Sequence, residues 1–174
     1  MITLAMQPAT MYDHDEIVRL LGSRQHWLSE RLLDQWQHKT HFADEMEQHI
    51  LAGETWVAKH VDVAIATITV SEDANLRWPE EERRQPALYV AKMATHMRYA
   101  GQGLGHRLIG WALDYAEERG IDRLRWDAWS SNTGLHEYYQ SLGARYLRTV
   151  DREGDRYPIK SGALFELARE DFQL

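Results

Sequence analysis

Apolar side chains in the first third of the chain recur at intervals of three and four residues, the period of an amphipathic helix. Asp13 is followed three residues later by Glu16, the arrangement of a helix N-cap and its capping-box partner. Two more helical stretches are predicted, over residues 27–36 and 42–50, and Gly53 stands where the second of them would end. The opening of the chain is therefore predicted to be mainly helical.

Strand-like runs dominate the middle of the chain. Residues 55–59 and 64–70 are rich in β-branched and aromatic side chains and predict a hairpin. Residues 2–6 predict a short first strand, and residues 88–95 a further one. Residues 71–86 are charged and carry two prolines, so a loop is expected there.

The remainder alternates helix and strand. An apolar face over residues 104–115 predicts a helix, and alternation over residues 124–129 predicts a strand. A short helix over residues 135–142 follows. Two closing strands, residues 146–150 and 163–168, are joined by a charged loop. This order indicates an α/β fold built on one sheet.

Composition narrows the class of protein. The 174 residues are 44% hydrophobic and suit one domain. The absence of cysteine excludes disulfides, thiolate catalysis and cysteine metal sites, and the nine histidines lack metal-ligand spacing, so no metal is predicted. A net charge of −7 argues against a nucleic-acid partner and slightly favours a cationic acceptor. No run approaches the roughly 20 apolar residues of a membrane helix, so we expect a soluble, cytoplasmic protein without a membrane partner.

The densest chemical signal is a glycine cluster between a predicted strand and a predicted helix, Arg98-Tyr-Ala-Gly101-Gln102-Gly103-Leu104-Gly105. Backbone N–H groups at such a helix start attract anions, and glycines allow positive φ and close approach. The cluster therefore predicts a phosphate or pyrophosphate site, with a simple tight turn as the alternative. A Walker loop is excluded because no Gly-Lys-Ser/Thr follows, and the spacing fits a Rossmann fingerprint poorly.

A third motif matches better. The turn resembles the pyrophosphate-binding motif of the GNAT superfamily, the acetyl-CoA-dependent N-acetyltransferases, in the form Arg98-x-x-Gly101-x-Gly103. A second motif of that superfamily, an Asn after a strand and a Tyr four residues before a Gly, is similar to Asn132-x-x-Leu135-x-x-Tyr138-Tyr139-x-x-x-Gly143. The similarity extends over essentially the whole chain.

The resemblance implies a single domain over residues 1–174, with a mixed central sheet of about six to seven strands and about four flanking helices. It implies acetyl-CoA as co-substrate, with its pyrophosphate surrounded by Arg98, Gly101, Gln102, Gly103, Leu104 and Gly105. Main-chain groups of Met93, Ala94 and Thr95 would pair with the pantetheine arm as an added strand. Asn132 would also bond the cofactor, or serve only as a helix N-cap.

Tyr139 would protonate the departing thiolate; the alternative is an aromatic residue packed in the core. The base that deprotonates the acceptor stays open between Asp127, His96 and water. The alternative for Asp127 is a solvated or Arg-paired strand carboxylate, and the alternative for His96 is a structural role. The predicted strand over residues 88–95 has no Glu, which some members of the superfamily use at this point.

The resulting hypothesis is an enzyme that moves acetyl from acetyl-CoA to a primary amine of a small molecule, by direct attack in a ternary complex. A protein Lys or N-terminal acceptor and a non-catalytic acyl-CoA sensor remain alternatives, and a homodimer remains open. Four tryptophans either pack in the core or line the acceptor pocket: Trp27, Trp36, Trp78 and Trp129.

Overall fold

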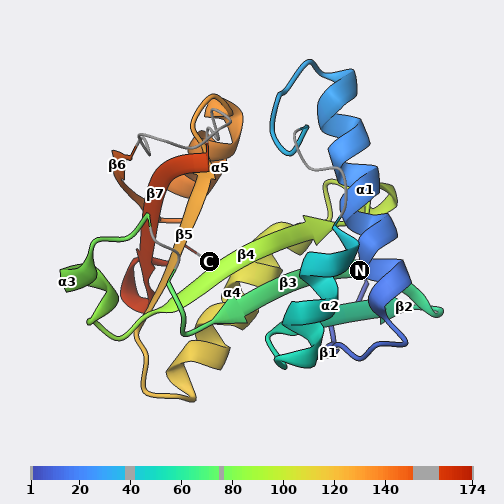
Figure 1. Ribbon diagram of the computed structural model, residues 1–174, viewed down its shortest axis with the longest axis horizontal. Coiled ribbons are helices and arrows are strands. Elements are labelled where there is room, and N and C mark those ends of the chain that lie inside the picture. Colours follow the sequence, from blue (N-terminus) through green and yellow to red (C-terminus); the bar gives the residue numbers. More distant parts are fainter. Residues whose placement is uncertain (1, 38–41, 75–76, 151–160, 174) are drawn as a thin grey trace. The chain divides into compact units, whose positions relative to one another are not determined.

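The computed structural model describes residues 2–37, 42–74, 77–150 and 161–173 (Figure 1). Seven strands lie within these residues: β1 (Met6–Pro8), β2 (Thr55–His60), β3 (Val63–Ser71), β4 (Leu88–Thr95), β5 (Arg123–Trp129), β6 (Arg145–Thr149) and β7 (Ser161–Ala168). The helices are α1 (His14–Glu30), α2 (Ala43–Leu51), α3 (Glu80–Arg83), α4 (Leu104–Glu117) and α5 (Thr133–Ser141), with 3-10 turns η1 (Met97–Tyr99) and η2 (Arg169–Asp171).

The strands form one mixed sheet in the order β1-β2-β3-β4-β5-β7-β6. Strands β4 and β5 are parallel, whereas β1 and β2, β2 and β3, β5 and β7, and β6 and β7 pair antiparallel. The α/β prediction with about six to seven strands is therefore confirmed. None of the helices in the described part of the chain is long and apolar enough to cross a bilayer.

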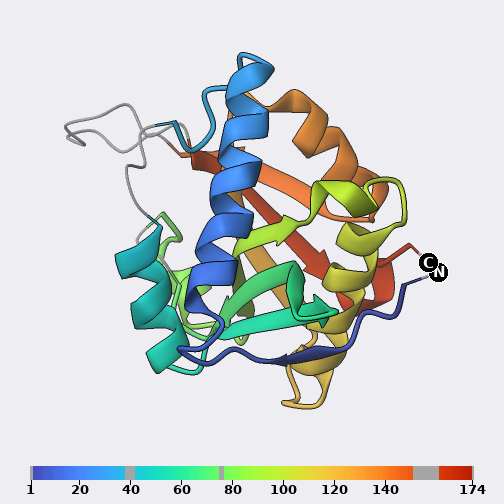
Figure 2. The same ribbon diagram turned by 90° about the vertical axis from the view of Figure 1, so that its right-hand side faces the viewer.

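The chain divides into two compact units, Met1–Val70 with Ala91–Trp111, and Ser71–Val90 with Ala112–Leu174. In the first unit, α1 and α2 pack on each other (Figure 2) and share an apolar cluster with the sheet. Val57 of β2 belongs to this cluster, whereas the neighbouring Trp56 packs on Trp111 of α4, with ring centroids 5.0 Å apart. Since successive strand residues face opposite sides, α4 covers the other face of the sheet from α1 and α2.

In the second unit, β5 and β7 pair so that Trp126 lies opposite Phe165 and Arg125 opposite Glu166. The aromatic pair is stacked, with ring centroids 6.1 Å apart, and packs against α5 through Tyr139. The charged pair belongs to the other face of these strands. The strand register therefore places this aromatic pair and this ion pair on opposite sides of β5 and β7.

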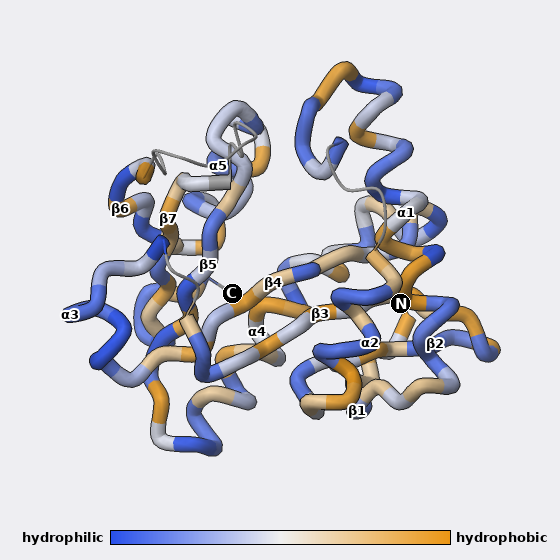
Figure 3. The backbone as a smooth tube through the Cα atoms, viewed as in Figure 1, coloured by the Kyte–Doolittle hydropathy of each residue, from blue (hydrophilic) through white to orange (hydrophobic). Residues whose placement is uncertain are grey.

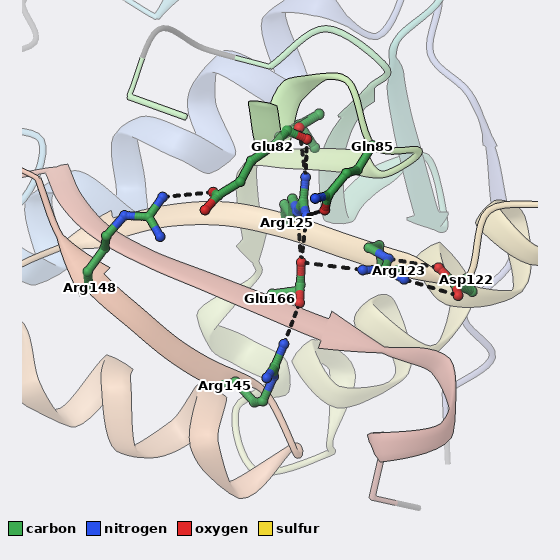
Figure 4. A network of polar contacts seen from close by, with 9 residues as sticks. Glu82, Gln85, Asp122, Arg123, Arg125, Arg145, Arg148 and Glu166 are labelled. Carbon is green, nitrogen blue, oxygen red and sulfur yellow. Dashed lines mark hydrogen bonds and ion pairs between the residues drawn. The ribbon is translucent and has the colours of Figure 1, made fainter. Parts of the chain in front are cut away.

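Arg125 is only 2% exposed and uses its guanidinium in several directions (Figure 4). Its Nε donates to Glu166 Oε2 at 2.8 Å, Nη1 to the Glu82 carbonyl at 2.6 Å, and Nη2 to Gln85 Oε1 at 2.7 Å. Glu166 also accepts from Arg145 at 2.6 Å. These bonds attach the α3 segment, which is charged throughout (Figure 3), to β5.

This network explains how β5 carries a buried cation. The segment over residues 77–86 covers Arg125 and supplies hydrogen-bond partners for it. The expected loop over residues 71–86 also contains the short helix α3. A buried cation is tolerated here because its donors are matched to acceptors.

Three local predictions near the N-terminus are wrong. The first strand is Met6–Pro8 rather than residues 2–6, and the Ile2 carbonyl instead accepts from Arg107 Nη1 at 2.8 Å. Asp13 is the N-cap of α1, but its carboxylate accepts from the Thr10 N–H at 2.8 Å and pairs with Lys59, so no capping box forms.

The separate helix expected over residues 27–36 is also absent from the described residues. Helix α1 runs through to Glu30, and Leu32 and Trp36 then have φ of +56° and +65°. Positive φ is incompatible with a right-handed helix, so these residues form a turn.

Other boundaries are confirmed. Strand β4 covers residues 88–95 as predicted, and the hairpin forms from β2 and β3. Helix α2 ends at Leu51, and Gly53 follows it with φ of +73°. The Gly53 N–H donates to Ile50 O at 3.0 Å, and the Glu54 N–H donates to His49 O at 2.9 Å. The charged loop expected between β6 and β7 lies outside the described residues.

Replacing Arg125 by Ala would leave the buried Glu166 without the most deeply buried of its cationic partners. We expect the free energy of unfolding to fall by about 3–5 kcal/mol. Arg145→Ala removes a bond to the same carboxylate from a side chain that is 65% exposed, so its loss should stay within about 1 kcal/mol. Urea denaturation compares the two variants, and equal losses would contradict the account of the network.

Burial raises the pKa of the Glu166 carboxyl, but hydrogen bonds from Arg125 and Arg145 outweigh it and hold this pKa below its usual range. A lowered folded-state pKa stabilises the protein above about pH 4.5 and loses that contribution as the pH falls further. Glu166→Gln should therefore be less stable than wild type at pH 7, with the difference shrinking below about pH 4.5. Urea titrations between these pH values measure it; a pH-independent difference would refute the assignment.

Candidate functional site

A glycine turn joins β4 and η1 to the start of α4 in the first unit. Gly101 has φ of +77° and Gly103 of +68°, values that side-chain-bearing residues adopt at a cost. A Cβ built at either position would meet no atom within 4 Å. The glycines are therefore required by the backbone conformation, and the space above the turn is open.

The amides that begin α4 lie in this turn. The Gly103 carbonyl accepts from the Arg107 N–H at 3.0 Å, which makes Gly103 the residue before the helix. Within the described residues, no group accepts a hydrogen bond from the amides of Gly103, Leu104 or Gly105. Gly101, Gln102 and Gly103 are exposed. Open amides at the positive end of a helix dipole can bind an anion.

His96 shapes the approach to the turn. Its Nδ1 accepts from the Arg98 N–H at 3.1 Å and so caps η1, and its ring packs edge-on against Tyr99 with centroids 5.8 Å apart. The structural alternative for His96 is confirmed by these contacts. The Arg98 side chain itself is exposed.

The end of β4 has one bonded edge and one outward edge. The His96 N–H donates to Ile65 O of β3 at 2.8 Å. In a trans peptide the C=O points opposite to the N–H, so the Thr95 carbonyl faces away from β3. By strand alternation the main-chain groups of Met93 also face away, and those of Ala94 face β3. The parallel ladder with β5 comprises Leu88↔Leu124 and Tyr89↔Arg125, upstream of Met93–Thr95.

Lys92 interrupts the extended backbone of β4 with φ of +48°. Its Nζ lies 2.8 Å from Glu45 Oε2 of α2. A non-glycine residue at positive φ inside a strand is uncommon and is often found beside functional sites. Sequence reasoning did not identify this position, since Lys gives no signal for positive φ.

Asn132 and Tyr139 lie in the second unit, on α5. Asn132 is the N-cap of that helix, with its Oδ1 accepting from the Leu135 N–H at 3.2 Å. The capping alternative is therefore confirmed. The predicted site residues thus form two groups: residues 93–105 on one strand–turn–helix segment, and this pair on α5.

The Tyr139 ring packs against Trp126 and Phe165, with centroids 5.0 and 5.5 Å away. It is 8% exposed, and no described residue hydrogen-bonds its hydroxyl. Burial raises the pKa of this phenol above its ordinary value, and the nearby Tyr138 and Asp127 raise it further. Tyr139 therefore remains protonated at neutral pH, as a proton donor must.

Asp127 forms an ion pair with Arg77, whose Nη1 lies 3.7 Å from Asp127 Oδ2; of the roles considered for Asp127, this is the Arg-paired carboxylate. The tryptophans mostly pack. Trp78 and Trp129 are buried, and Trp36 meets Phe42 edge-on with centroids 5.4 Å apart. Trp27 differs, because guanidinium groups of Arg24 and Arg31 lie 5.3 and 4.0 Å from its ring centroid.

Comparison with known proteins agrees with this geometry. The model of the acetyltransferase (GNAT) family matches residues 22–144, and the chain belongs to that family. It is 28% identical over 151 residues to the uncharacterized N-acetyltransferase YesJ of Bacillus subtilis (strain 168), covering 80% of this chain and 81% of YesJ. The chain is an acyltransferase with acetyl-CoA as co-substrate.

Solved structures show the same fold. A GNAT-family acetyltransferase from Listeria monocytogenes 4b F2365 superposes with a TM-score of 0.76 at 18% identity, covering 96% of this chain and 98% of the other. The PaiA N-acetyltransferase of Thermoplasma acidophilum, solved in complex with coenzyme A, gives 0.68 at 13% identity, covering 96% and 99%.

Gly103→Ala should weaken acetyl-CoA binding because it strains the positive φ that presents the amides. We expect the KM for acetyl-CoA to rise about tenfold, with a stability loss of about 1 kcal/mol. Gly22→Ala on α1 is the matched control, since its Cβ also meets nothing within 4 Å and its φ is not positive. It should leave KM unchanged and stabilise the helix by about 0.5–1 kcal/mol. An unchanged KM in Gly103→Ala would remove the turn from the cofactor site.

Proposed function

We propose that this chain transfers acetyl from acetyl-CoA to the primary amine of a small molecule, by direct attack in a ternary complex. The observation that carries the proposal is the open glycine turn, whose amides at Gly103, Leu104 and Gly105 are unbonded in a chain of this family. These amides, with Gly101, Gln102 and the Arg98 side chain, suit the pyrophosphate.

The pantetheine arm suits the outward edge of β4. Its amides can exchange hydrogen bonds with the main-chain groups of Met93 and Thr95, in the manner of an added strand. The main-chain groups of Ala94 face β3 instead, and its side chain, which is 4% exposed, belongs to the apolar cluster shared with α1 and α2. Asn132 is proposed to add a hydrogen bond to the cofactor arm. When bound, acetyl-CoA supplies the acetyl group as a thioester.

Tyr139 is proposed as the proton donor to the departing sulfur. A phenol has an ordinary pKa near 10 and a thiol near 8.5, so proton transfer from phenol to thiolate needs the site to favour it. The ring contacts with Trp126 and Phe165 hold the phenol in one orientation. The proton then passes from the Tyr139 hydroxyl to the sulfur as the carbon–sulfur bond breaks.

The acceptor ammonium must lose a proton before its nitrogen attacks. Asp127 is paired with Arg77, and the Nδ1 of His96 is used to cap η1. Both candidates are therefore engaged in structural contacts, which favours water as the route for this proton. A cysteine-borne acetyl is excluded because the sequence has no cysteine, which supports the ternary complex.

Tyr139→Phe should lower kcat by about a hundredfold while leaving the KM for acetyl-CoA near wild type, because Phe keeps the ring contacts and loses only the proton. Tyr138→Phe is the matched control. Tyr138 is the half-buried neighbour on the same helix, and its substitution should leave kcat within about twofold of wild type. Steady-state thiol release measures both, and a Tyr139→Phe enzyme with wild-type kcat would remove this residue from the mechanism.

Release of free thiol from acetyl-CoA across a panel of amines and peptides tests the function itself. We expect thiol release with small amines. Release with peptides alone would assign the acceptor to proteins. Thermal stabilisation by acetyl-CoA without thiol release for any acceptor would favour a sensor, and no stabilisation at all would refute the shared premise.

A further inference from the structure

Arg24 of α1 reaches the outward edge of β4. Its Nη2 donates to the Thr95 carbonyl at 2.7 Å and to Thr95 Oγ1 at 3.0 Å. This carbonyl is the one that faces away from β3, on the edge proposed for pantetheine. A cation from a helix 71 residues away in sequence is therefore placed beside the strand end.

The guanidinium has no anionic partner within the described residues. No carboxylate there lies within ion-pair distance of Arg24, and Thr95 accounts for both of its hydrogen bonds. A guanidinium carries five N–H donors, and the bonds to Thr95 use the Nη2 atom alone. The two edges of a guanidinium that match a carboxylate both include Nη2, so the Nε and Nη1 donors are available singly, and each can donate to a carboxylate oxygen.

The surroundings make this charge costly. Arg24 lies against the Trp27 ring, and burial lowers its pKa with no opposing charge to raise it. Two other buried or half-buried cations are matched to carboxylates, Arg125 to Glu166 and Lys92 to Glu45. Buried charges are usually paired, so Arg24 has the character of a ligand-binding group.

We propose that Arg24 binds the carboxylate of the acceptor, so that the enzyme acetylates amines that also carry a carboxylate, the class of amino acids. This inference rests on the proposed function. The pantetheine arm is uncharged, and the phosphates of acetyl-CoA are assigned to the glycine turn. An anion beside Thr95 therefore comes from the acceptor.

A carboxylate-bearing acceptor differs from the cationic acceptor that the net charge of the protein favours. A surplus of −7 slightly favours a cationic acceptor, but a zwitterion has no net charge and is not repelled by it. Arg24 would attract one end of such a molecule and leave its amine directed elsewhere. Arg31, which stacks on the same Trp27 but is exposed, provides a matched control.

The test uses matched acceptors: a set of L-amino acids, their carboxamides and the corresponding decarboxylated amines. Thiol release at saturating acetyl-CoA gives kcat/KM for wild type, Arg24→Gln, Arg24→Lys and Arg31→Gln. We expect wild type to prefer the carboxylate over the amide by at least about tenfold, as for a charged hydrogen bond. Arg24→Gln should abolish this preference and Arg31→Gln should retain it, with the KM for acetyl-CoA within about twofold throughout.

Two results would overturn the inference while leaving the transferase function intact: wild type that acetylates amides or decarboxylated amines as well as amino acids, and Arg24→Gln that keeps the preference. A rise in acetyl-CoA KM matching the loss in acceptor kcat/KM would likewise reassign Arg24 to the cofactor. Should Arg24→Gln not fold, Arg24→Lys carries the test, since an ammonium cannot replace the separate Nε and Nη1 donors and the preference should fall at least about threefold. Absence of thiol release from every amine would instead refute the transferase function, and this inference with it.

Discussion

Main-chain hydrogen bonding is the constraint on which the candidate site depends. A strand within a sheet uses its amides and carbonyls on both edges, and a helix leaves its first amides without partners. The segment from Met93 to Gly105 combines both situations. The β4 end is bonded to β3 through His96, its Thr95 carbonyl faces outward, and a turn with two positive-φ glycines then leads into the open amides of α4. Polar main-chain groups are thereby gathered along a single stretch of chain.

Several residues combine a structural contact with a proposed chemical one. Asn132 caps α5 with its oxygen and is also proposed to bind the cofactor, and His96 caps η1 next to the end of β4. Tyr139 is both a packed aromatic and the proposed acid. Such overlap favours binding, because a side chain already held by packing or capping loses little further conformational entropy when a ligand binds. It also explains why a structural role and a chemical role can both be assigned to the same motif residue without conflict.

What the sequence could predict is what local chemistry decides. The limits of β4, the glycine end of α2 and the cap of α5 follow from period and from residue type at particular positions. What it could not predict depends on distant partners. Asp13 turns toward Thr10 and Lys59 instead of completing a capping box, and Arg125 is buried because the α3 segment covers it. The contact between Arg24 and Thr95 joins two elements that no short pattern connects.

The pairing of β5 with β7 has a consequence that concerns folding fidelity. Arg125 faces Glu166 and Trp126 faces Phe165, one pair on each side of the strands. A slip of β7 by one residue would set Phe165 opposite the buried guanidinium and turn the carboxylate toward α5, where Tyr139 rests on aromatic rings. The unpaired charge makes that alternative alignment costly. The ion pair between Arg125 and Glu166 on one side of the strands thus favours the alignment in which the aromatic rings on the other side pack against Tyr139, the proposed catalytic phenol.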